Sequence, residues 1–292
     1  MGNLTTLIND SVSEGLPLQL KHIFRTTVAK KSKERLPLQK NESKVDVILR
    51  QPTIDKEARK SLVNCIFNIE LSYHLDTITA FTAVEIFGRF LSAQVISGKE
   101  EAMYASVVAV HISSKYHETG LFRRPVLSEL LECVTRGSPD LNGLNCRLGM
   151  AMEDRILNAL DMEIDVPSVH TFLIRFYKAA KIWPDTKTTL MASFYAKLGI
   201  WDYDLKMTYP TEKLAAAALY AACVLTHNIR MWRDTYRSHT VFKDTELWKC
   251  TKRMMELHLV GLGGHESCCS WIIKNMILIS QLPKKLHTSS VR

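Results

Sequence analysis

The stretch AMYASVVAVHISSKYHE, residues 102–118, decides the fold of this chain. It is a helix-forming run that is apolar almost throughout, until Lys115 places a charge one turn beyond its middle. A second stretch, LGMAMEDRILNALDMEIDVP at residues 148–167, is interrupted in the same way by Glu153. Because burying an unpaired charge is costly, we expect these two residues either at the rim of a core or as contacts for another chain.

Helical periodicity extends outward from these stretches over most of the chain after residue 44, and strand-type alternation is almost absent. Two alanine-rich segments, AMYASVVAV and KLAAAALYAACVL (residues 213–225), are small on every side and suit the centre of a helical bundle. The sequence therefore predicts an all-α fold with two tandem five-helix bundles. The expected helices span about 56–72, 77–92, 100–116, 125–136 and 144–161, then 168–181, 186–202, 210–227, 244–260 and 268–281.

The charge of the chain is concentrated near its beginning. The formal net charge is +8, and residues 21–44 contain eight lysines and arginines against Glu34 and Glu42. A basic tail is weaker evidence for nucleic-acid binding than a basic folded face, so no direct nucleic-acid partner is expected. The predicted division is a mobile basic extension (1–44), a first fold (45–166), a second fold (167–264) and a C-terminal helix and tail (265–292).

Metal, cofactor and membrane functions are not indicated. The seven cysteines lack paired zinc-site spacing. His265, Cys268 and Cys269 lie close in sequence, but a closed zinc site needs four ligands, so we expect no metal and no cofactor. The longest apolar run, residues 214–225, is 12 residues long, which is shorter than the ~18 needed to cross a bilayer.

Four motifs carry a resemblance to a known family. In order and spacing, over roughly residues 45–260, they resemble the A- and B-type cyclins, specifically in the first fold and more loosely in the second. The resemblance implies an N-terminal cyclin box followed by a second cyclin fold. The motifs are QPTI (51–54) followed by Arg59 and Leu62, TAVEIFGRFLS (82–92), HISSKYHE (111–118) and the run from Met152 to Pro167.

The resemblance gives the two interrupting charges a role. Lys115 and Glu153 match the family's Lys–Glu pair, which hydrogen-bonds to a cyclin-dependent kinase near its mobile C-helix. This implies a non-enzymatic subunit that binds and activates such a kinase as a heterodimer, controlling cell-cycle progression or transcription, with the transcription machinery as a further class of partner. The apolar seat for the C-helix is matched by Ile112, Tyr116, Leu157, Met162 and Ile164.

A second family surface is degraded in this chain. Cell-cycle cyclins dock substrate Arg-x-Leu motifs on a patch that opens with Met-Arg-Ala-Ile-Leu, followed by a tryptophan and a glutamate. The matching positions here are Ala58, Arg59, Leu62, Cys65 and Asn68. Loss of a large aromatic side chain and a carboxylate weakens a docking site, so we expect poor substrate docking. Gly88 also stands where the family has an aspartate.

The extension carries three short signals. Lys30, Lys31 and Lys33 form a short basic pattern that predicts nuclear import, and we expect the protein in the nucleus and the cytoplasm. The sequence RLPL at residues 35–38 is compatible with a minimal destruction box. Gly2 satisfies a loose myristoylation pattern.

The sequence is also compatible with two other functions. A general transcription factor of the IIB type also uses tandem cyclin folds, but it predicts basic residues across the second fold and a zinc ribbon upstream. A viral cyclin that redirects host kinases toward transcription would explain the compact chain and the degraded docking patch. An enzyme is not indicated, because the sequence has no phosphate-binding glycine loop and no evident nucleophile–histidine pair.

Overall fold

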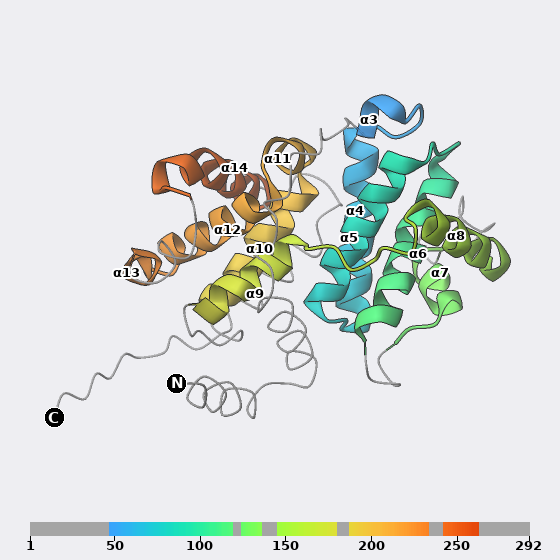
Figure 1. The fold of residues 1–292 in the computed structure, drawn as a ribbon, viewed down its shortest axis with the longest axis horizontal. Coiled ribbons are helices and arrows are strands. Elements are labelled where there is room, and N and C mark those ends of the chain that lie inside the picture. Colours follow the sequence, from blue (N-terminus) through green and yellow to red (C-terminus); the bar gives the residue numbers. More distant parts are fainter. Residues whose placement is uncertain (1–46, 119–123, 136–144, 180–186, 234–241, 263–292) are drawn as a thin grey trace.

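A computed structural model gives the architecture of the chain (Figure 1). Within the described residues every regular element is a helix, as the sequence predicts, and the helices form two consecutive bundles. The structure describes residues 47–118, 124–135, 145–179, 187–233 and 242–262.

The first bundle comprises five long helices preceded by one short one. All five lie within a few residues of the predicted positions. The helices are α3 (Val47–Arg50), α4 (Lys56–Tyr73), α5 (Thr77–Ala93), α6 (Lys99–His117), α7 (Leu127–Thr135) and α8 (Cys146–Ala159).

The second bundle also follows the prediction, except for two short helices that were not predicted, at Tyr203–Thr208 and Ile229–Met231. A helix was expected to run to residue 202, but Asp202 instead starts a separate short helix by accepting a hydrogen bond from the Leu205 amide at 2.9 Å. The tenth predicted helix, 268–281, lies outside the described residues. The described helices are α9 (Val169–Ala179), α10 (Lys187–Trp201), α11 (Tyr203–Thr208), α12 (Thr211–Leu225), α13 (Ile229–Met231) and α14 (Asp244–Leu262).

The alanine-rich helices α6 and α12 occupy the centres of the two bundles. Residues 105–110 of α6 and 214–219 of α12 are at most 1% exposed. Helix α6 contacts α4, α5, α7 and α8, and α12 contacts α9, α10 and α14. Small side chains allow this close approach on all sides, which explains why both segments lack a polar face.

Helix α8 is seated on its neighbours by two local features. Asn145 caps its first turn by accepting a hydrogen bond from the Leu148 amide at 3.0 Å. Gly149 then faces α7 so closely that a Cβ atom would lie 2.9 Å from the Leu127 side chain. The absence of a side chain at Gly149 therefore sets how closely α8 approaches α7.

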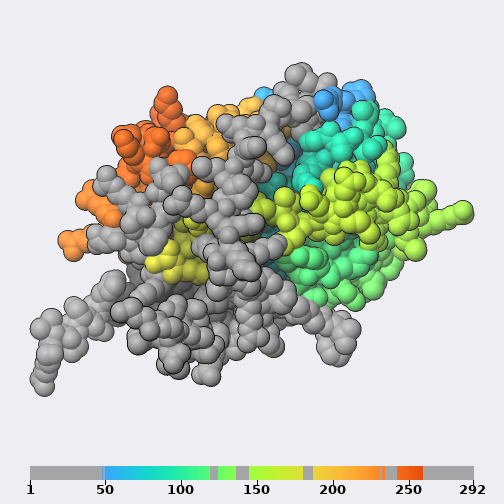
Figure 2. Space-filling model, in the orientation of Figure 1, coloured from blue at the N-terminus to red at the C-terminus, as the bar shows by residue number. Residues whose placement is uncertain are grey.

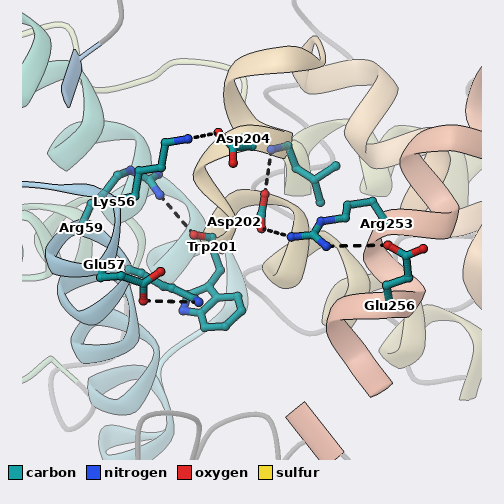
Figure 3. Close-up of polar contacts among 10 residues, drawn as sticks. Lys56, Glu57, Arg59, Trp201, Asp202, Asp204, Arg253 and Glu256 are labelled. Atoms are coloured by element: carbon teal, nitrogen blue, oxygen red, sulfur yellow. Dashed lines mark hydrogen bonds and ion pairs between the residues drawn. The ribbon is translucent and has the colours of Figure 1, made fainter. Parts of the chain in front are cut away.

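One place where the two bundles meet lies between α4 and the turn from α10 to α11 (Figure 3). The Arg59 guanidinium, only 4% exposed, donates to the carbonyl oxygens of Ile200 at 3.2 Å and Trp201 at 3.3 Å. Burial lowers its pKa to about 10. Lys56 pairs with Asp204 at 2.6 Å nearby. Arg59 therefore connects the first bundle to the carbonyl end of α10.

Candidate protein-binding groove

The two charges that interrupt the apolar stretches form an ion pair with each other. Lys115, in the last turn of α6, donates to the Glu153 carboxylate of α8. The Lys115 side chain is 40% exposed and that of Glu153 is 14% exposed. Lysine is also favoured at a helix C-terminus, where the helix dipole is negative. The pair therefore lies at the rim of the core, and each of the two charges has its counter-ion within the chain.

Two of the residues predicted for the apolar seat are exposed. Tyr116 follows Lys115 and is 51% exposed, whereas Met162 lies just beyond α8 and is 67% exposed. Leu157 and Ile164 are partly buried against the core. Ile112 is only 2% exposed, so it belongs to the core and does not contribute surface to the groove. Of the five residues predicted for the apolar seat, Tyr116 and Met162 are therefore exposed and Leu157 and Ile164 are partly exposed.

The position of Met162 is set by how α8 ends. Asp161 and Met162 both adopt left-handed backbone angles, with φ of 50° and 61°. The Met162 amide returns a hydrogen bond to the Leu157 carbonyl at 2.9 Å, which is the pattern of a Schellman C-cap. Non-glycine residues with positive φ are uncommon and often occur at functional sites.

The segment after α8 is also held from the side by Arg89 of α5. The Arg89 guanidinium donates to the Glu163 carbonyl and lies 3.8 Å from the Glu163 carboxylate. In the space-filling view (Figure 2), the yellow-green surface of α8 and the following segment lies across the green surface of α6 and α7. Arg89 therefore holds the segment that contains Met162 against α5.

The structure places His111 beside Glu153, although His111 is not among the residues that the sequence predicts for the site. Its Nε2 atom lies 3.9 Å from the Glu153 carboxylate, and its side chain is 14% exposed. Burial, and then the neighbouring Lys115, lower its pKa below the ordinary value, while Glu153 acts in the opposite direction. The spacing of four residues between His111 and Lys115 on one helix was the signal available in the sequence.

The degraded docking patch is only partly a surface. Ala58, Cys65 and Asn68 are partly exposed along α4. Arg59 and Leu62 are 4% and 5% exposed, which corrects the expectation that they belong to a surface patch. Both side chains point to the inner side of α4. Arg59 donates hydrogen bonds to the second bundle, and Leu62 packs in the core.

A hollow of about 350 Å³ lies on the other flank of α8. Its Arg155 already pairs with Glu101, donates to the Val95 carbonyl at 3.2 Å and packs over the Phe90 ring. The cationic side chain that lines this hollow is therefore already paired within the chain. Its lining residues are Glu100, Glu101, Tyr104, Leu148, Ala151, Met152 and Arg155.

Several sequence predictions fall outside the described residues. These are the basic extension 1–44 with Lys30, Lys31 and Lys33, the signals at Gly2 and residues 35–38, and the segment 265–292. Within the described ranges, no group of three or more histidine, cysteine, aspartate or glutamate side chains could hold a metal ion. No helix in those ranges has the length and apolarity needed to cross a membrane.

Comparisons with known proteins agree with the architecture. The family model for the N-terminal domain of cyclins matches residues 29–165, and the model for the C-terminal domain matches residues 167–268. Cyclin-B1-3 of Arabidopsis thaliana is 31% identical over 219 residues, which are 75% of this chain and 50% of that protein. G2/mitotic-specific cyclin-2 of Antirrhinum majus is 29% identical, over 71% of this chain and 45% of that protein. The chain thus spans about half the length of these relatives.

A solved structure supports the fold. The viral cyclin of herpesvirus saimiri superposes with a TM-score of 0.54 at 17% identity, over 72% of this chain and 90% of the viral protein. At this identity the likeness concerns the fold alone. The two domain matches together cover most of the chain, in the order and at the positions of the two observed bundles. The chain is therefore a member of the cyclin family, built from an N-terminal cyclin box and a second cyclin fold.

Proposed function

We propose that this chain is a regulatory subunit that binds and activates a cyclin-dependent kinase, and that the active site belongs to the kinase. The observation that carries the proposal is the Lys115–Glu153 pair at the rim of the core. Two exposed apolar side chains accompany it, Tyr116 next to Lys115 in sequence and Met162 just beyond α8. Apolar contact area supplies affinity, while fixed charges give orientation and register.

The way the pair is held supports this role. Because Lys115 and Glu153 already contact each other, they are in position before a partner arrives, and less conformational entropy is lost on binding. Each still has capacity for a further hydrogen bond, since an ammonium has three donors and a carboxylate has several acceptor sites. A kinase helix that binds best in its active position would be shifted toward that position.

Within this proposal, a cell-cycle role is favoured over a transcriptional one. Two of the relatives carry the name G2/mitotic-specific cyclin, from Antirrhinum majus and Glycine max. Nuclear and cytoplasmic localisation, based on Lys30, Lys31 and Lys33, remains a prediction of the sequence.

A pull-down from a panel of purified cyclin-dependent kinases tests the proposal. The double variant Lys115→Glu/Glu153→Lys keeps an ion pair within the chain but reverses the charges presented to a partner. We expect it to keep its helical circular dichroism and to lose kinase binding. The matched control is Lys252→Glu/Glu256→Lys, a charge reversal of an exposed pair on α14. Equal kinase capture by wild type and the Lys115/Glu153 variant would show that the groove is misassigned.

A further inference from the structure

The carboxylate of Glu153 faces two basic side chains at once. Its Oε1 atom accepts from Lys115, and its Oε2 atom lies 3.9 Å from His111 Nε2. His111 and Lys115 lie one turn apart on α6, so both project toward the same part of α8. A distance of 3.9 Å is too long for a hydrogen bond, and a small movement of Glu153 would close it.

We propose that His111 controls the partner of Glu153: a neutral imidazole leaves the carboxylate to Lys115, whereas a protonated imidazole draws it away and releases the lysine. This is a positioning role, because His111 would act on a partner through Glu153. The inference rests on the proposed function only where kinase affinity is concerned.

The surrounding charges define the direction of the effect. The groups that face His111 are Lys115 on its own helix, Glu153 on α8, and Arg124 and the Pro125 carbonyl before α7. Burial, Lys115 and Arg124 lower the pKa of His111, whereas Glu153 and the Pro125 carbonyl raise it, and the net pKa lies below the ordinary value. At neutral pH the imidazole is therefore uncharged, and Glu153 remains with Lys115.

Acidification reverses this arrangement. An imidazolium at His111 attracts the Glu153 carboxylate and repels the Lys115 ammonium. The attraction draws the carboxylate toward His111, and the repulsion favours movement of the more exposed Lys115 away from it. A kinase that recognises the Lys115–Glu153 pair would bind the neutral form of His111 better. The affinity for the kinase would depend on one proton, bound by the His111 imidazole, whose pKa is below about 6.5. Linkage therefore limits the loss of kinase affinity at pH 5.5 to about ten-fold.

The first experiment needs no kinase. In a proton-nitrogen and proton-carbon NMR titration of the full chain, the Lys115 side-chain signals should change with the same midpoint as the His111 ring. His111→Gln should abolish that step, and Glu153→Gln should lower the midpoint of His111. The inference is overturned if the Lys115 signals keep their titration step in His111→Gln, or do not respond to pH in the wild type.

The second experiment measures affinity for a kinase captured in the pull-down, at pH 7.5 and pH 5.5. We expect the wild type to lose affinity at pH 5.5, by no more than about ten-fold, and His111→Gln to lose less than the wild type, as linkage to one imidazole requires. His227→Asn is the control, because His227 is exposed and asparagine tolerates its positive φ of 58°. An equal pH effect in His111→Gln contradicts the inference. Coupled NMR titrations without capture of any kinase would instead contradict the proposed function alone.

Discussion

The ammonium of Lys197, on α10 of the second fold, lies 2.8 Å from the carboxylate of Glu70, on α4 of the first fold. The two side chains are 5% and 6% exposed. The Lys197 ammonium also lies 5.5 Å from the centre of the Phe67 ring. A buried ion pair therefore crosses between the two folds.

Removing one member of this pair should be far more harmful than removing both. Lys197→Met leaves the Glu70 carboxylate buried without its cation, and breaking a buried pair costs about 3–5 kcal/mol. The double variant Lys197→Met/Glu70→Met replaces both charges with apolar groups of similar length, which is often neutral or stabilising. Urea unfolding followed by circular dichroism measures both free energies of unfolding.

The exposed pair Lys252 and Glu256 provides the control, since its two charged groups lie 3.9 Å apart in solvent. Such pairs contribute about 0–1 kcal/mol, so Lys252→Met should change the free energy of unfolding little. If the double variant at positions 70 and 197 is as unstable as the single one, the cost does not arise from an uncompensated charge.

His170 should make the stability of the chain depend on pH. Its ring stacks on Phe81 at 5.5 Å and is buried, and burial, Lys197 and His117 lower its pKa to about 3. In the unfolded chain a histidine has a pKa of about 6.5. As the pH falls, the histidine is therefore protonated in the unfolded state before it is protonated in the folded state. The contribution of His170 to the free energy of unfolding is fully present above about pH 6.5 and is lost as the pH drops toward about 3.

The measurement is the thermal midpoint between pH 7 and pH 4.5, for wild type and His170→Phe. The variant removes the titrating group and keeps a ring against Phe81, so it should lose less stability on acidification than wild type. The control His227→Asn changes an exposed histidine and should retain the wild-type slope. A slope in His170→Phe equal to that of wild type would contradict the assignment.

Substrate docking on α4 should be weak and partly restorable. Ala58 and Asn68 are partly exposed, so larger or charged side chains at these positions can reach a peptide. We expect Arg-x-Leu peptides to bind this chain at least about ten-fold less tightly than an A-type cyclin, a loss of about 1.4 kcal/mol that one missing aromatic anchor can supply. The variant Ala58→Met/Asn68→Glu should recover part of this affinity.

Fluorescence anisotropy with a labelled Arg-x-Leu peptide gives the affinities. A matched control, Ala58→Met/Ser72→Glu, adds the same side chains but places the carboxylate one turn further along α4, at an exposed position. Improvement in the control equal to that in the Asn68 variant would mean that general charge attraction, and not the docking patch, is being measured. Wild-type affinity equal to that of an A-type cyclin would contradict the prediction outright.

The fold could be predicted from the sequence to a large extent. The alanine-rich segments that became α6 and α12 are recognisable because a helix buried on all sides must be small on all sides. Helix boundaries were accurate where a cap or a proline marks them. Helix α11 was missed as a separate element, because Asp202 can continue a helix or cap a new one, and only its bond to Leu205 distinguishes these.

The candidate site was predicted less completely. Lys115 and Glu153 were selected by their charge on apolar helices, whereas His111 was not, because a histidine among apolar residues is ordinary in a core. Arg59 was assigned to a surface patch from its motif and is instead buried between the folds. A motif identifies a position along a helix but not the element that packs against it.

The sequence by itself determined the helical class, the two small central helices and the residues available for the groove, since periodicity and residue size are properties of each segment alone. Only the tertiary structure decided that Lys115 pairs with Glu153, that His111 faces the same carboxylate, and that Lys197 reaches Glu70. These contacts join residues 38 to 127 positions apart. Their partners depend on how helices cross in space, which no local pattern specifies.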